Sequence, residues 1–204
     1  MAEVLRSVSS ESDGSYDVIA VRKRFPALRR LENGYPVALL DGPGGSQAAD
    51  TAIDAVAGYL MRGSANVHGV HGTSVETDEI IANARVAMAD FVGGSPDEIA
   101  FGANMTTLNY AIARAIARDW REGDEIVVTE LDHRANVDPW TSAAEERGVK
   151  IRWIRVDPEV LVLKTHDLSG IITSKTKLVA VGLASNAVGT INDVKSIAKT
   201  AHQV

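Results

Sequence analysis

The sequence predicts an α/β fold in which helices cover both faces of a mainly parallel sheet. Apolar runs of strand length at 125–129, 150–156 and 178–183 alternate with segments of helical periodicity. Strands that alternate with helices are joined by right-handed crossovers, which make neighbouring strands parallel. The run at 178–183 is apolar without interruption, as expected for a strand that is covered on both faces.

Composition excludes several classes of protein. The 204 residues carry a net charge of −6, are 45% hydrophobic and include no cysteine. Without cysteine there is no disulfide framework, thiolate metal site, iron–sulfur cluster or cysteine nucleophile. The charges form no concentrated basic face, so no nucleic-acid partner is expected. The chain also lacks an apolar run long enough for a membrane span and a signal peptide at its start, which favours a cytoplasmic location.

The chain divides into a leader and one α/β domain. Residues 1–15 are rich in Ser, Asp, Glu and Gly and predict a flexible leader. Residues 16–204 predict the domain, in which Ser74 is a candidate cap for a helix that runs to about residue 91. Further helices are predicted at 18–30 (interrupted at Pro26), 47–61, 108–116, 137–147 and 191–201, a weaker element at 167–173, and further short strands at 37–40 and 99–101.

The sequence stops directly after a predicted crossover helix. An alternating fold would supply another buried strand there, so we expect a C-terminally truncated domain.

Polar residues follow three predicted strands, where ligands bind in open α/β sheets. Asn104, Met105 and Thr106 open a helix whose free amides could hold a phosphate, although Asn104 or Thr106 could also serve only as a cap. His133 follows the strand at 125–129, and Asn186 follows the strand at 178–183. Either could instead be an ordinary loop or turn residue.

Two other patterns argue against common kinds of site. The spacing of His68 and His71 could suggest a metal, but no cysteine and no helical His-Glu-x-x-His pattern supports one. The glycine-rich turn at 42–45 does not complete a dinucleotide fingerprint, because Gln47 stands where a third glycine is needed.

Taken in order, these segments resemble the class V aminotransferase superfamily of pyridoxal-phosphate (PLP) enzymes, most closely its cysteine desulfurase-like branch. The most specific stretches are ELDHRANVDPW at 130–140 and SNAVGTIN at 185–192. The resemblance begins at FPAL (25–28) and continues through LDGPG (40–44), Arg85, IAF (99–101) and AHQ (201–203). It implies the large domain of a PLP-dependent transferase of fold type I and a homodimer.

The resemblance implies roles for particular residues. Asn104, Met105 and Thr106 match the family's phosphate cradle, with the Met105 and Thr106 amides and the Thr106 hydroxyl on the PLP phosphate. His133 matches the histidine that stacks on the pyridine ring, the catalytic candidate in this chain. Asn186 matches the asparagine that bonds the phenolic oxygen of the ring.

Further positions match the family's contacts with its amino-acid substrate, namely Gly44, Gly45 and His71. The resemblance also implies elements beyond Val204: the lysine that bonds PLP, the aspartate that pairs with the pyridinium nitrogen, and a small C-terminal domain.

The sequence therefore predicts the N-terminal part of an enzyme that would act on an amino acid through an external aldimine but is not expected to be active alone. Desulfuration, transamination, lyase and epimerase chemistry all stay open. The alternative is a noncatalytic remnant that binds a phosphate-bearing ligand or a partner chain.

Overall fold

The computed structural model describes residues 16–204, so the leader predicted at 1–15 lies outside the described residues. The chain forms two compact units whose boundary falls between Pro96 and Asp97. This boundary lies inside the segment 16–204 that the sequence assigns to one domain. Each unit is described by itself.

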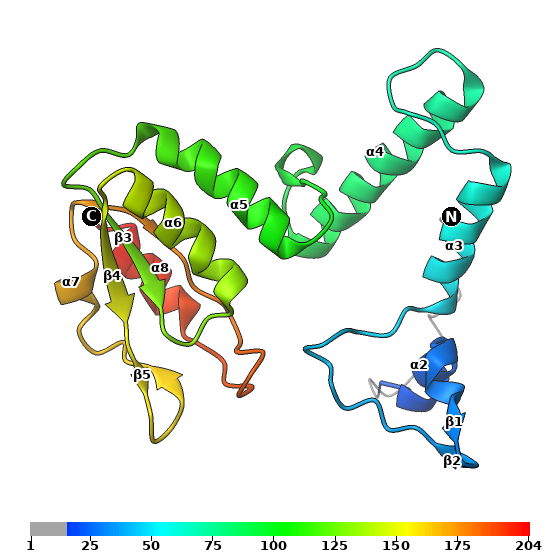
Figure 1. The fold of residues 1–204 in the computed structure, drawn as a ribbon, viewed down its shortest axis with the longest axis horizontal. Helices are drawn as coiled ribbons and strands as arrows, with labels where there is room; N and C mark the ends of the chain where they lie inside the picture. The colour runs from blue at the N-terminus through cyan, green and yellow to red at the C-terminus, as the bar shows by residue number, and fades with distance from the viewer. Residues whose placement is uncertain (1–15) are drawn as a thin grey trace. The chain divides into compact units, whose positions relative to one another are not determined.

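The first unit is helical with one small hairpin (Figure 1). Its strands β1 and β2 pair antiparallel through Leu31↔Pro36 and Glu32↔Tyr35. Of its described side chains, only Ser74 and Ala89 are buried. The elements are α2 (Val18–Lys23), η2 (Pro26–Arg29), β1 (Leu31–Glu32), β2 (Tyr35–Pro36), α3 (Asp50–Arg62) and α4 (Gly72–Val92).

Two predictions for this unit are wrong. Residues 37–40 form no strand, because they have no ladder partner among the described residues and Leu40 is 89% exposed. Ser74 does not cap α4, which starts two residues earlier with His71 at the cap position. Instead the buried Ser74 hydroxyl donates to the Asn66 carbonyl at 2.6 Å and accepts from the Gly69 amide at 2.7 Å, which holds the preceding loop.

The second unit contains the parallel sheet, with strand order β4-β3-β7. Strand β3 (Glu125–Thr129) pairs in parallel with β4 (Lys150–Ile154) on one side and β7 (Thr176–Val179) on the other. The short η3 (Pro96–Glu98) spans the boundary between the units. The remaining elements are α5 (Met105–Ile116), η4 (Ala117–Asp119), η5 (Arg134–Asn136), α6 (Asp138–Glu146), β5 (Val156–Asp157), β6 (Val162–Leu163), α7 (Leu168–Ile171) and α8 (Val194–Ala201).

Alternate residues of β3 face different layers of helix. Ile126 and Val128 belong to a buried cluster with side chains of α5 and α6, whereas Val127 belongs to a second cluster with Ile197 of α8. This alternation follows from the two-residue period of a strand. Figure 1 shows α6 and α8 on either side of the sheet. The predicted parallel sheet with helices on both faces is confirmed.

The sheet is smaller than the sequence predicts in two places. Residues 99–101 form no strand, because they have no ladder partner among the described residues and Phe101 is 53% exposed. The run at 178–183 pairs only as far as Val179, after which the chain leaves the ladder. It then forms a loop closed by the bridge Ala184↔Ile191.

Candidate functional site

Helix α5 begins with two free backbone amides. The Asn104 side chain caps the helix by accepting from the Thr107 amide at 2.9 Å. The amides of Met105 and Thr106 donate to no described residue, and both residues are exposed. Unpaired amides at the start of a helix carry a partial positive charge and are suited to an anion.

The turn before α5 depends on close packing against the helix. A Cβ atom at Gly102 would lie 2.6 Å from the Leu108 side chain, a separation that real Cβ atoms essentially never show. Glycine therefore lets the backbone approach the Leu108 side chain of α5.

His133 lies in the turn after β3, and its ring is fixed by one backbone hydrogen bond. The amide of Ala135 donates to Nδ1 of His133 at 3.0 Å. Because Nδ1 accepts this bond, the proton of the neutral ring is on Nε2. The residue is exposed, so one edge of the imidazole is held by the backbone while its remaining surface is open to a ligand.

Asn186 lies in the tight loop after β7. Ser185 organises this loop: its amide donates to the Thr190 carbonyl at 2.9 Å and its hydroxyl accepts from the amides of Ala187 and Val188 at 3.3 Å. Asn186 itself is exposed, and its side-chain amide bonds to none of the described residues. The loop thus presents a free amide next to the carboxyl end of the sheet.

A hydrogen-bond network connects the His133 turn to the chain after β7. Asp132 accepts from the Thr129 hydroxyl at 2.5 Å and from the Gly182 amide at 3.0 Å. Its other oxygen accepts from the Asn136 side chain at 2.9 Å. The same network reaches α5, because Asn109 donates to the Ala135 carbonyl at 2.9 Å. Three segments that carry candidate residues are therefore joined at one edge of the sheet.

The remaining candidate residues lie in the first unit. The Gly44 amide donates to Asp41 at 3.1 Å, and the Gly45 amide donates to the Gly42 carbonyl at 3.2 Å. His71 is exposed and its Nδ1 lies 3.0 Å from the Thr73 hydroxyl.

The aminotransferase class-V family model matches residues 38–204. The chain belongs to the aminotransferase class V family. Among curated relatives, it is 36% identical over 186 residues to a cysteine desulfurase of Serratia proteamaculans, covering 90% of this chain and 46% of that protein. It is 34% identical to a probable cysteine desulfurase of Streptomyces coelicolor, covering 94% of this chain and 47% of the relative. The chain thus spans about half the length of the curated relatives it matches.

Solved structures of this family share the fold. The apo cysteine desulfurase of Thermococcus onnurineus superposes with a TM-score of 0.82 at 30% identity, covering 93% of this chain and 46% of that one. A second structure, a C-DES mutant with glycine covalently linked to the PLP cofactor, has a TM-score of 0.58 at 22% identity and covers 76% of this chain and 39% of that one. The large-domain fold expected from the resemblance is confirmed.

The groups at this edge suit PLP, the cofactor of the class V family. Free amides at the start of α5 suit a phosphate, the flat ring of His133 suits an aromatic face, and the free Asn186 amide suits a phenolic oxygen. No set of three or more metal-ligating side chains comes together between residues 16 and 204. Within the same range, no helix has the length and apolar character needed to cross a membrane.

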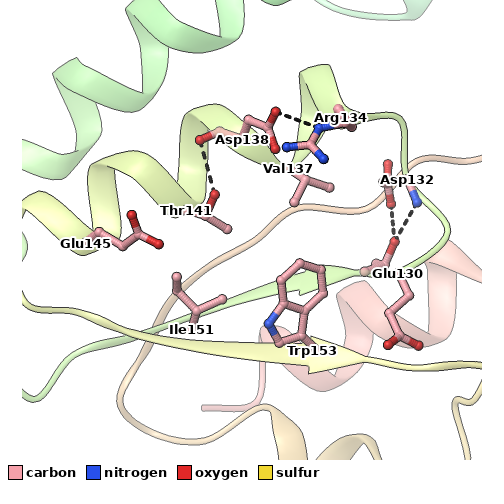
Figure 2. Close-up of a pocket in the computed structure, with 10 residues that line it drawn as sticks. Glu130, Asp132, Arg134, Val137, Asp138, Thr141, Glu145, Ile151 and Trp153 are labelled. Atoms are coloured by element: carbon pink, nitrogen blue, oxygen red, sulfur yellow. Dashed lines mark hydrogen bonds and ion pairs between the residues drawn. The ribbon is translucent and has the colours of Figure 1, made fainter.

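A hollow of about 630 Å³ lies beside this edge, between α6 and β4. Figure 2 shows Ile151 and Trp153 of β4 across from Thr141 and Glu145 of α6. The polar residues that line the hollow include Asp132 and Arg134, the two neighbours of His133, but none of the candidate residues lines it. The hollow is therefore distinct from the candidate cofactor contacts.

No sequence pattern assigned roles to the residues of the network, namely Asn109, Thr129, Asp132 and Gly182, or to Asn192, whose side chain donates to the Gly182 carbonyl at 2.8 Å. Asp132 and Asn192 lie inside the two most specific family stretches, which is the only signal that pointed to them.

Proposed function

We propose that this chain forms the part of a PLP site that holds the phosphate, one ring face and the phenolic oxygen, in a protein that acts on an amino acid. The observation that supports this most is the network of hydrogen bonds that joins the α5, His133 and Asn186 segments at one edge of the sheet. Membership of the class V family supports it independently.

Helix α5 would hold the phosphate. The amides of Met105 and Thr106 are unpaired, and the Thr106 hydroxyl adds a third donor at the same helix end. The Asn104 cap leaves these donors free because it takes only the Thr107 amide. The positive end of the helix dipole favours the phosphate charge.

His133 and Asn186 would hold and tune the ring. The Ala135 amide fixes the imidazole through Nδ1, so the ring of His133 can lie flat against an aromatic ligand without rotating. The Asn186 amide can donate to a phenolic oxygen, which stabilises the negative charge of that oxygen. PLP itself supplies an electron-withdrawing ring that stabilises negative charge on a bound amino acid.

The same proposal names residues that would contact the substrate. The backbone of Gly44 and Gly45 and the exposed His71 would contact the amino acid. Sequence similarity to cysteine desulfurases also supports a homodimer in the cytoplasm. Sedimentation velocity of the full chain tests the dimer, and fluorescence microscopy of the tagged chain in its host tests the location.

Titration of the full chain with PLP tests the proposal. We expect saturable binding, followed by PLP absorbance. It should weaken about 10-fold in T106V and N186A, because each loses a hydrogen bond to a charged group, and by up to about 10-fold in H133A, which loses the aromatic contact. Pyridoxal, which lacks the phosphate, should bind more weakly, and T106V should not change its affinity. D119N is the matched control, because Asp119 is exposed and lies beyond the far end of α5 from the proposed phosphate.

Two results would oppose this function. If PLP does not bind, or binds equally to all four variants, the proposed site is wrong. If inorganic phosphate binds as tightly as PLP and is weakened only by T106V, the chain is a phosphate-binding module instead.

A further inference from the structure

One residue, Gly182, is held through both of its backbone polar groups. Its amide donates to Oδ2 of Asp132 at 3.0 Å, and its carbonyl accepts from Nδ2 of Asn192 at 2.8 Å. Asp132 directly precedes His133, and Asn192 closes the loop that carries Asn186, since its amide donates to the Leu183 carbonyl at 2.8 Å. The backbone of Gly182 therefore links the two loops that carry the ring-contacting candidates.

The Asp132 side of this link requires a carboxylate. Three donors converge on it: the Thr129 hydroxyl, the Gly182 amide and the Asn136 side-chain amide. The Thr129 hydroxyl also accepts from the Asp132 amide at 3.1 Å, so its own proton is donated to the carboxylate. An amide at position 132 would place an NH₂ group against at least one of these donors.

The Gly182 side of the link requires glycine. A Cβ atom there would lie 2.7 Å from Oδ1 of Asp132. No side chain fits between this backbone and the carboxylate, so any larger residue would push Asp132 away. The close approach gives a way to break the contact without deleting a hydrogen-bonding group.

The Asn192 side is buried. Asn192 is 7% exposed and holds Gly182 through its Nδ2, whereas its Oδ1 has no partner among the described residues. Burying an amide whose oxygen has no partner costs free energy of folding. The hydrogen bond from Nδ2 to the Gly182 carbonyl offsets part of that cost.

We propose that Asp132, Gly182 and Asn192 form a clamp that positions His133 and Asn186 relative to one another; the proposal rests on the PLP-binding function above. His133 and Asn186 are both exposed and lie on loops after different strands. Loops of this kind move independently unless something joins them. The clamp supplies that connection, so the two contacts to the cofactor ring are set before the cofactor binds.

The first experiment tests the connection without any cofactor. Amide NMR spectra of the full chain are compared for wild type, D132N, G182A and D119N. We expect D132N and G182A to move the signals of residues 183–191 as well as those of 131–136, whereas D119N moves neither set. Hydrogen exchange at the Gly182 amide should rise in D132N. Shifts confined to residues 131–136 would overturn the clamp.

The second experiment tests positioning, using a double-mutant cycle on PLP affinity. D132N and N192A should each weaken PLP binding about 10-fold, and the double variant should lose about 10-fold rather than 100-fold, because both act through the backbone of the same residue, Gly182. G182A should behave like D132N. All variants are measured at a temperature where circular dichroism shows them folded, so that a general loss of stability does not imitate the effect.

Failure of the clamp and failure of the proposed function look different. Multiplicative losses in the double variant, or unchanged PLP affinity in D132N, would overturn the positioning role even if wild type binds PLP. A third outcome is that wild type fails to bind PLP although D132N and G182A still move the NMR signals of both loops. In that case the proposed function is wrong, and the positioning role that rests on it is overturned too.

Discussion

Arg152 binds the buried carboxylate of Glu125 through two hydrogen bonds, from Nε to Oε2 at 2.6 Å and from Nη2 to Oε1 at 2.8 Å. The Thr173 hydroxyl donates to the same carboxylate at 2.8 Å. Only 6% of the Glu125 side chain is exposed. Glu125 is the first residue of β3, so this contact ties β3 to β4 at the end of the sheet opposite Asp132.

The contact predicts a loss of stability without a loss of ligand binding. E125Q keeps the shape of the side chain but removes the charge that Arg152 binds. We expect the free energy of unfolding to fall by about 2 kcal/mol, the typical worth of a hydrogen bond to a charged group. Urea unfolding measures this, and PLP affinity below the unfolding transition should stay unchanged. A loss of affinity in folded E125Q would contradict the separation of the two sheet ends.

The same contact predicts a pH dependence. The hydrogen bonds from Arg152 hold the pKa of Glu125 below its ordinary value of 4.5, against the opposing effect of burial. A carboxyl group with a lowered folded-state pKa stabilises the fold above its unfolded-state pKa and loses that contribution as the pH falls further. Between pH 7 and pH 3, wild type should therefore lose more stability than E125Q. Equal losses in the two proteins would show that Glu125 does not contribute.

Two substitutions at Asn104 separate helix capping from phosphate binding. N104D keeps a capping oxygen for the Thr107 amide, so its stability should match that of wild type, whereas N104A should lose about 1 kcal/mol. The carboxylate of N104D, however, brings a negative charge to the place proposed for the phosphate. PLP affinity should fall about 10-fold in N104D, an effect that high salt reduces. Unchanged PLP affinity in N104D would argue against a phosphate at α5.

The close approach of Gly102 to Leu108 predicts strain when a methyl group is added. G102A should lower the free energy of unfolding by about 1–3 kcal/mol, the usual cost of overpacking. Thermal unfolding followed by circular dichroism measures the change. G72A is the matched control, because a Cβ atom at Gly72 meets nothing within 4 Å. Equal melting temperatures for the two variants would mean that the turn can shift freely.

Strands were predicted correctly where an apolar run also found partner strands in the folded chain. The run at 125–129 became the central strand, buried at all five positions, because a parallel strand lies on each side of it and helices cover both faces. The runs at 37–40 and 99–101 had similar local patterns but find no partner strand between residues 16 and 204, and a ladder cannot form from one segment alone.

Sequence position alone names the candidate site residues but not their connections. Thr106, His133 and Asn186 are candidates because each comes after a predicted strand, and their roles stay predictions. The bond from Gly182 to Asp132 joins residues 50 positions apart, and it depends on the exact place where the chain leaves β7. No periodicity or motif spacing encodes such a contact, so only the three-dimensional structure could reveal it.

An NMR titration with PLP tests the central claim most directly. The full chain is titrated first with PLP and then, in a separate sample, with pyridoxal. PLP should shift the amides of Met105 and Thr106, the His133 ring and the Asn186 side-chain amide together, and pyridoxal should shift only the last two. Shifts centred on Trp153 and the hollow beside α6, or shifts at Met105 and Thr106 alone, would contradict the account.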